Sequence, residues 1–390
     1  MKQQKHYIYR LFLTFALAVA VTSCNGKKAD SGNSENINKG QDTKEITVRH
    51  AKGFRVENIA GAYVVEIEDP QKEEGKAEVY KFVFVANRDK YAKTEELKDH
   101  KEIDIPINKV VCMTTLQLSN FITINELDKV VGITSTRHLF NEDVKLRIKN
   151  KQIYKIGIEG NFDSEVIMAI NPDVILISPF KRGGYDAIKD VGIPLIPHLG
   201  YKESTPLAQA EWIKFVGMLT GTEEKSNKTF DNIEQEYSKL REITSKVDKR
   251  PTVFSGDLKG GNWYAVGGKS FLAQLFRDAG ADYFLKDDDN TGGVTLDFET
   301  VYSKAAKCNY WRLLNSYDGK FSYDALKEMD SRYTDFDAFK NKGLIYCNLK
   351  ERAYYENMPT RPDLLLKDFI KVFHPELLPD YEPTFYELMK

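Results

Sequence analysis

The feature that most constrains the fold of this chain is a helical run near its middle, from Thr205 to about Lys249. Thr205 is a good N-cap residue, and Pro206 suits a first helical turn. Apolar residues then recur at three- and four-residue steps, as on one face of an amphipathic helix: Leu207, Trp212, Phe215, Val216 and Leu219. Such a helix must pack one face against the rest of the protein.

The second half of the run predicts a break and a further helix. Gly221 permits a left-handed cap, and Thr222 with the acids after it has the pattern of a new helix start. The apolar stripe then continues with Phe230, Ile233, Tyr237 and Leu240. Because the stripe is narrow and the opposite face is charged, the pattern favours a long helix across two lobes, with one side packed and the other in water. The alternative is an ordinary helix pair inside one domain.

The composition is that of a globular protein without an excess of basic residues. The chain has 390 residues, 42% of them hydrophobic and 29% charged, and its net charge is −2. This length permits two or three domains with sizeable cores. The charge balance gives no electrostatic support for nucleic acid as a partner.

The first 24 residues have the features of an export signal in the expected order. Basic residues lie among the first ten, and the apolar run that follows, Leu11 to Val21, is too short for a comfortable transmembrane helix. The small residues before Cys24 resemble the lipobox of bacterial lipoproteins, in which the cysteine is lipidated. This resemblance implies a periplasmic lipoprotein with a lipid anchor in the membrane. A plain secretory signal with an incidental cysteine is the alternative.

Strand and helix patterns alternate on both sides of the central run. Before it, we expect strands at 109–113, 130–134, 174–177 and 194–197, and helices at 116–127, 164–170 and 185–190. After it, we expect strands at 252–255, 263–266, 309–314 and 344–348, and helices at 270–279, 298–306, 323–329, 364–372 and 385–389. This alternation implies crossover connections and largely parallel sheets that are covered on both faces.

These patterns predict an α/β fold with two α/β lobes joined by a long bridging helix and preceded by a small antiparallel β unit. Strand-like stretches predict the β unit, and the sequence indicates no function for it. The predicted order is signal peptide and lipobox (1–24), flexible tether (25–44), β unit (45–107), N-terminal lobe (108–203), bridging helix (204–249) and C-terminal lobe (250–390).

Each half of the chain also places an acid in the first turn of an equivalent helix. Glu165 follows Asp163 at one helix start, and Glu299 follows Asp297 at the other. By themselves, these acids are explained by the helix dipole.

The order of motifs from about Asn108 to Lys390 resembles the periplasmic ligand-binding proteins of ABC importers for ferric siderophores, haem and cobalamin. The resemblance rests on Glu165 ahead of Asn171-Pro172-Asp173, the long central run, Gly267-Gly268-Lys269-Ser270, and Glu299. Asn262-Trp263-Tyr264 and Arg361-Pro362-Asp363 are similar to a branch common in Bacteroidota.

The resemblance implies a binding protein that is not an enzyme. Such a protein captures an iron chelate, haem or cobalamin between its lobes and delivers it to an ABC permease dimer with its ATPase. In this family one Glu on each lobe docks onto arginines of the permease, and the matching positions are Glu165 and Glu299. A monomer without a resident cofactor is expected.

Ligands of open α/β sheets lie beyond the carboxyl ends of the strands. The loops there carry cations and aromatic rings, which suit a bulky anionic chelate because they neutralise oxygen ligands and supply rigid contact area. The candidate ligand-binding residues are Arg137, His138, Lys181, Arg182, Tyr185, Trp263, Tyr264, Arg352, Tyr354, Tyr355 and Arg361. His138 and Tyr185 are also of the residue types that ligate haem iron.

Besides a surface lipoprotein that hands its ligand to an outer-membrane receptor, two other functions stay open. A zinc- or manganese-binding protein also has a helix between its lobes, but it needs three or four His and carboxylate ligands, and only His138 is well placed. An exported enzyme is the second, although no catalytic motif is evident. Cys112, Cys308 and Cys347 are expected to be buried thiols, and export leaves a Cys308–Cys347 disulfide open.

Overall fold

The computed structural model describes residues 43–390, except 74, 135, 159 and 180–184. The predicted signal peptide and Cys24 therefore lie outside the described residues, as do Lys181 and Arg182. The described residues belong to one compact unit. Within the described part, no helix is both long and apolar enough to cross a membrane.

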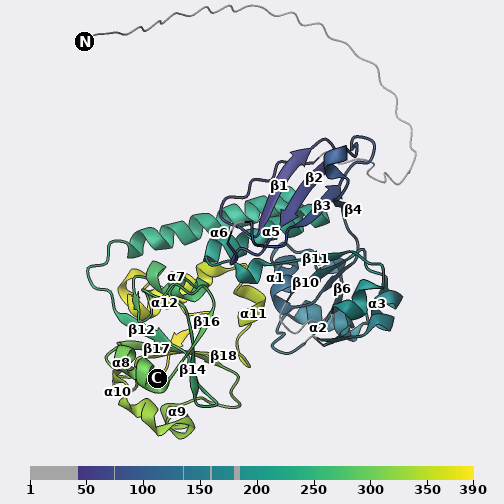
Figure 1. Ribbon diagram of the computed structural model, residues 1–390. Helices are drawn as coiled ribbons and strands as arrows, with labels where there is room; N and C mark the ends of the chain where they lie inside the picture. The colour runs from purple at the N-terminus through teal and green to yellow at the C-terminus, as the bar shows by residue number, and fades with distance from the viewer. Residues whose placement is uncertain (1–42, 74, 135, 159, 180–184) are drawn as a thin grey trace, which may run out of the picture. The chain divides into compact units, whose positions relative to one another are not determined.

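The first sheet of the described part has four strands, β1 (Phe54–Ile59), β2 (Ala62–Ile67), β3 (Tyr80–Val85) and β4 (Lys101–Asp104) (Figure 1). The first three strands pair antiparallel, but β4 runs parallel to β3. The predicted antiparallel unit is therefore a mixed sheet. The reason is that residues 86–100 form a crossover instead of a hairpin turn, and Tyr91 and Leu97 in it pack on the sheet.

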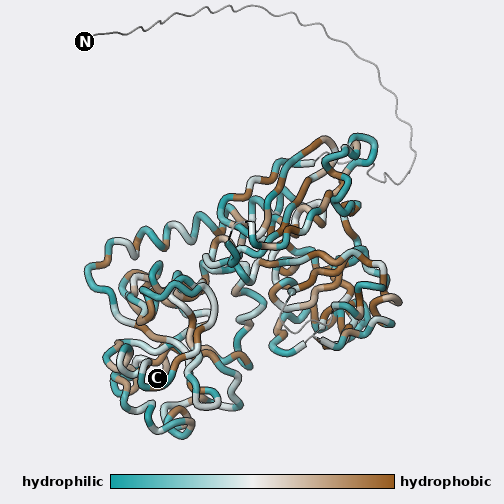
Figure 2. The backbone as a smooth tube through the Cα atoms, in the orientation of Figure 1, coloured by the Kyte–Doolittle hydropathy of each residue, from teal (hydrophilic) through white to brown (hydrophobic). Residues whose placement is uncertain are grey.

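The N-terminal lobe contains a five-stranded parallel sheet in the order β11-β10-β5-β6-β7. The strands are β5 (Val110–Cys112), β6 (Val130–Ile133), β7 (Tyr154–Lys155), β10 (Val174–Ile177) and β11 (Leu195–Pro197). The helices are α1 (Thr115–Thr123), α2 (Glu142–Lys149), α3 (Ser164–Ile170) and α4 (Asp186–Lys189), and β8 (Gly157–Ile158) forms a hairpin with β9 (Asn161–Phe162). All four residues of β10 are buried, as expected of a strand covered on both faces, and hydrophobic residues gather along these strands in Figure 2.

The C-terminal lobe repeats this architecture with the order β15-β12-β17-β18-β19. Its strands are β12 (Thr252–Ser255), β15 (Asp282–Tyr283), β17 (Tyr310–Asn315), β18 (Leu344–Asn348) and the antiparallel β19 (Glu387–Leu388). A second sheet consists of β13 (Asp257–Lys259), β14 (Asn262–Val266) and β16 (Gly293–Leu296). The helices are α7 (Phe271–Asp278), α8 (Phe298–Ala305), α9 (Tyr323–Met329), α10 (Asp337–Lys340), α11 (Tyr354–Asn357) and α12 (Pro362–Phe373).

The helix predicted at 385–389 is wrong, because this stretch is extended and contains β19. The buried carboxylate of Asp368 accepts hydrogen bonds from the backbone N–H groups of Thr384, Phe385 and Tyr386, at 2.7 to 2.9 Å. These bonds and the pairing of β19 with β18 satisfy the backbone without a helix.

The central run forms two helices, α5 (Pro206–Thr220) and α6 (Glu223–Thr244). Gly221 between them has a left-handed backbone with φ of 69°, which confirms the predicted cap. Phe230 and Ile233 of α6 pack in the core of the N-terminal lobe, whereas Tyr237 and Leu240 pack in that of the C-terminal lobe. One helix therefore contributes to both cores.

The expectation of a water-exposed face is wrong for α5, whose fifteen residues are all buried. The segment before β1 covers the polar residues Glu211 and Lys214, and Phe54 of the first sheet packs on the apolar stripe; the sheet lies along α5 in Figure 1. The Phe54 ring lies 4.8 Å from the Trp212 ring and 5.6 Å from the Phe215 ring.

Two buried glutamates attach the segment before β1 to α5. Glu211 accepts hydrogen bonds from the backbone N–H groups of residues 49–51, at 2.6 to 2.9 Å, and its counterion is Lys214 at 2.8 Å. Glu203 accepts hydrogen bonds from the N–H groups of Lys52 and Gly53, at 3.0 and 2.8 Å. Burial raises the pKa of Glu203. Burial also acts to raise the pKa of Glu211, but Lys214 and the amides outweigh it and leave that pKa lowered.

Candidate functional site

The two lobes contact each other at His138, in the loop after β6. Its Nδ1–H donates a hydrogen bond to the carbonyl oxygen of Leu349, at 2.8 Å, and its Nε2 lies 3.4 Å from the hydroxyl of Ser316. Because a carbonyl only accepts, this contact places a proton on Nδ1. His138 has a left-handed backbone, with φ of 61°. The contact joins the carboxyl ends of the strands in both lobes.

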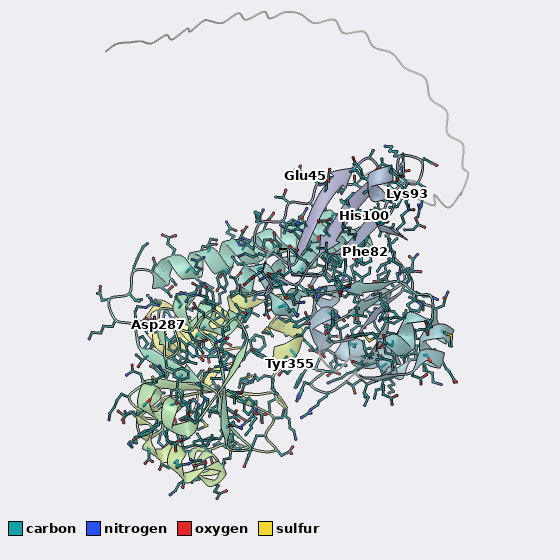
Figure 3. The ribbon with its side chains drawn as sticks, in the orientation of Figure 1. Glu45, Phe82, Lys93, His100, Asp287 and Tyr355 are labelled. Carbon is teal, nitrogen blue, oxygen red and sulfur yellow. The ribbon has the colours of Figure 1, made fainter. Side chains whose placement is uncertain are left out.

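Tyr355, in α11, lies against this histidine. The two ring centroids are 5.9 Å apart, and Tyr355 is labelled in Figure 3. Burial raises the pKa of the Tyr355 hydroxyl, and the positive charges of Arg312 and Arg137 act against that shift. One tyrosine therefore lies within the electrostatic reach of an arginine from each lobe.

Arg312 is the most unusual charge of this region. It projects from β17, its guanidinium lies 4.9 Å from the centre of the Tyr386 ring, and its Nη2 donates a hydrogen bond to the Tyr386 hydroxyl. Its Nε is buried without a hydrogen-bond partner, and within the described residues no carboxylate forms an ion pair with it. Arg312 is half-buried, and the carboxylate of Asp257 lies within its electrostatic reach but forms no ion pair with it. A buried N–H without a hydrogen-bond partner is costly, so this guanidinium is suited to bind an anionic group from outside the chain.

The N-terminal lobe contributes buried neutral groups at the carboxyl ends of its strands. Gln117 donates a hydrogen bond to the Ser178 hydroxyl at 2.9 Å, and burial lowers the pKa of the nearby His198 to about 3. These residues line a cavity of about 10 Å³, which Pro359 of the other lobe also lines. The Oδ1 of Asn120 there is buried without a partner. The volume suits about one water molecule, which satisfies such an atom.

Several other predicted ligand residues pack against, or form hydrogen bonds with, other residues of the protein. Trp263 is fully buried in the aromatic core of the C-terminal lobe and donates its indole N–H to the Ser255 carbonyl. Tyr185 is buried, stacks on Phe162 and hydrogen-bonds Ser178. Tyr354 packs behind Tyr355, with ring centroids 5.4 Å apart.

The two remaining predicted arginines form ion pairs away from His138. Arg361 binds Asp363 through two hydrogen bonds, at 2.8 and 2.9 Å, and lines a cavity of about 430 Å³ with Thr123 and Glu236. Arg352 pairs with Glu387 at 3.2 Å. The last predicted residue, Tyr264, is 46% exposed on β14. The structure therefore brings together Arg137, His138 and Tyr355, with Tyr354 behind them, whereas Tyr185, Trp263, Arg352 and Arg361 bind other groups of the protein.

The sequence interpretation missed Arg312 and Glu356. Arg312 lies within a strand that reads as hydrophobic, and the lone charge between Trp311 and Leu313 was the available signal. Glu356, which is 4% exposed, had no sequence signal because its partners are backbone N–H groups of the other lobe.

Glu165 and Glu299 occupy the same position in equivalent helices. Each follows an aspartate N-cap by two residues, in α3 and α8 respectively, and each is exposed. Three residues further along, each helix also exposes an apolar side chain, Met168 at 53% and Tyr302 at 38%. Residues three apart share one helix face, so each lobe presents an acid beside an apolar residue.

Among the described residues, no group of three or more His, Cys, Asp or Glu side chains is arranged to hold a metal ion. Cys308 and Cys347 are both buried free thiols, so the disulfide that the sequence left open does not form in this structure.

Two α/β lobes that share one long helix and meet at the carboxyl ends of their strands are the architecture of solute-binding proteins. The periplasmic binding protein family model matches residues 110–350, and the chain belongs to this family. The sheet of β1 to β4 precedes the matched range.

Relatives and solved structures agree with this assignment. An uncharacterized lipoprotein of Methanocaldococcus jannaschii is 23% identical over 75% of this chain and 71% of its own length. A possible iron-binding, periplasmic solute-binding protein of Staphylococcus epidermidis has a similar fold, with a TM-score of 0.55, 16% identity, and coverage of 69% of this chain and 100% of that one. An ABC-type Fe³⁺-hydroxamate transport protein of Saccharomonospora viridis gives a TM-score of 0.54 at 16% identity, with coverage of 75% and 96%.

Proposed function

We propose that this protein captures an iron chelate, such as a ferric siderophore or haem, or cobalamin, at the junction of its lobes and delivers it to an ABC permease. The observation that carries the proposal is Arg312, a half-buried cation whose Nε has no hydrogen-bond partner and which forms no ion pair in the described part of the chain. An anionic group of a chelate would supply the missing charge.

The neighbours of Arg312 support a bulky ligand. Arg137 adds a second, exposed cation from the other lobe, and Tyr355 and His138 add rigid ring surface. Aromatic side chains provide large contact area with few rotatable bonds, which lowers the entropic cost of binding. The possible iron-binding protein of Staphylococcus epidermidis and the Fe³⁺-hydroxamate transport protein of Saccharomonospora viridis have a similar fold.

A titration of the chain from residue 25 onward tests the ligand class. The probes are haem, cobalamin, a trianionic ferric tris-catecholate, a neutral ferric tris-hydroxamate, Zn²⁺ and Mn²⁺, and the readouts are melting temperature and visible absorbance. We expect a coloured chelate to stabilise the fold by a few kcal/mol at large excess over its Kd, because it binds only the folded state. Stabilisation by Zn²⁺ or Mn²⁺ alone would favour the metal-binding alternative, and turnover of a chelate would favour an enzyme.

Delivery would use Glu165 and Glu299. Exposed carboxylates, one on each lobe, suit a partner that presents an arginine twice, as a permease dimer does. Lipidation at Cys24 would keep the protein at the membrane that holds the permease. Mass spectrometry of the protein purified from membranes tests the anchor. We expect residues 1–23 to be absent and a diacylated Cys24 to be the first residue.

A further inference from the structure

A carboxylate of the C-terminal lobe holds the loop that carries Arg137 and His138. Glu356 in α11 accepts hydrogen bonds from the backbone N–H groups of Phe140, at 2.7 Å, and of Asn141, at 3.0 and 3.1 Å. Its neighbours Arg352 and Arg361 pair with other acids, Glu387 and Asp363. The two amides of the opposite lobe are therefore the groups that compensate this buried carboxylate.

The effect of this contact extends into the N-terminal lobe. Asn141 is the N-cap of α2, and its side chain accepts a hydrogen bond from the backbone N–H of Val144, at 3.0 Å. Glu356 thus fixes the end of the loop where α2 begins. His138 fixes the other end through Leu349. With both ends held, the segment between them has little freedom.

We propose that Glu356 is a positioning residue of the ligand site, and this inference rests on the proposed function. In the ligand-free protein it sets the backbone of residues 137–141, so that His138 lies against Tyr355 and Arg137 lies within electrostatic reach of it before a chelate arrives. A site that is ordered in advance loses less conformational freedom on binding and binds more tightly. The C-terminal lobe thereby shapes the part of the site that the N-terminal lobe contributes.

A second contact between the lobes provides a matched control. The hydroxyl groups of Thr123 in α1 and Thr360, after α11, lie 2.7 Å apart. This hydrogen bond also joins the lobes, but it does not involve residues 137–141. Thr360→Val removes it with little change in shape, so it tests the loss of a lobe contact alone.

The test combines hydrogen exchange of the ligand-free protein with titration by the ferric tris-catecholate. For Glu356→Gln we expect exchange at Phe140 and Asn141 to accelerate at least about 10-fold, and Kd to rise about 10-fold, because the amide keeps the shape but replaces one acceptor by a donor. Glu356→Asp, one methylene shorter, should lie between this variant and the wild type. Thr360→Val should change neither quantity more than about 2-fold.

Unchanged exchange at Phe140 and Asn141 in a folded Glu356→Gln protein would overturn the proposal. An equal rise of Kd in Thr360→Val would overturn it as well, since any lobe contact would then have the same effect. The failure of the proposed function looks different. In that case the exchange changes as expected, but the wild type binds none of the chelates, and Glu356 is left as a lobe contact only.

Discussion

Residues 49–53 and residues 140–141 are both held by buried glutamates, but the two attachments differ in strength. The first uses Glu203 and Glu211, five backbone amides and the buried counterion Lys214. The second uses Glu356 and two backbone amides. The first attachment, which has a counterion, holds the segment before the sheet whose Phe54 ring packs on α5. The second attachment, which has none, lies at the candidate ligand site.

The difference indicates that the first attachment serves the stability of the fold and the second serves the ligand site. The first sheet completes the core around α5, so it is a fixed part of the N-terminal lobe. The contact between the lobes has few hydrogen bonds and lies beside Arg312 and Tyr355, where a ligand would enter. Weak contacts belong where a protein must exchange a ligand, because local opening draws on the least stable contacts.

The strongest test of the comparison is Lys214→Met. This change leaves Glu211 buried without its cation, and breaking a buried pair in this way costs about 3–5 kcal/mol. Denaturant unfolding should show this loss. Lys239→Met, at an exposed position of α6, is the control and should change stability by less than about 0.5 kcal/mol. Equal losses in the two variants would show that the attachment does not depend on the ion pair.

Exposed glutamates provide the opposite case, because they should matter for a partner and not for the fold. We expect Glu165→Gln with Glu299→Gln to slow chelate uptake through the cognate permease about 10-fold, since the charges that would meet its arginines are gone. Ligand affinity and melting temperature should stay unchanged. Glu328→Gln, an exposed position of α9, is the control. Normal uptake by the double variant would remove these glutamates from the docking proposal.

The smallest effect is a difference in pH dependence between the two glutamates below the sheet. The pKa of Glu211 is lowered in the folded state, so its stabilisation is present above its ordinary pKa and is lost as the pH falls through the folded value. The pKa of Glu203 is raised, so ionisation weakens the fold as the pH rises through its folded value.

The matching variants should therefore have opposite slopes. The stability advantage of the wild type over Glu211→Gln should shrink as the pH is lowered from 7 to 3. Its advantage over Glu203→Gln should shrink as the pH is raised from 4 to 7. Unfolding curves across this range measure both. Parallel slopes would mean that Lys214 does not distinguish the two carboxylates.

Periodicity was sufficient to predict much of the fold. The strands β10, β12 and β18 and the helices α3 and α9 begin and end at the expected residues, and Gly221 ends α5 as expected. These signals are local, since they depend on side-chain spacing and caps within one element. The expectation of an exposed face on α5 was wrong because the distant segment before β1 covers Glu211 and Lys214, and no local pattern contains that information.

The site shows the same division between local and distant information. Arg137, His138 and Tyr355 follow strand-like runs and were predicted from the position of loops in α/β sheets. Trp263 was predicted in the same way, but it turns into the core of its own lobe. Arg312 and Glu356 were missed because their importance comes from what lies opposite them in space.

Arg312→Met tests the central claim most directly, because it removes the half-buried cation and keeps a similar volume. The measurement is the Kd of the wild type and of this variant for the trianionic tris-catecholate and the neutral tris-hydroxamate. A hydrogen bond to a charged group contributes about 2 kcal/mol, so we predict that the variant loses about 30-fold in affinity for the anionic chelate and less than about 3-fold for the neutral one. Equal losses for both chelates, or no loss for either, would contradict the assignment of Arg312 to the ligand site.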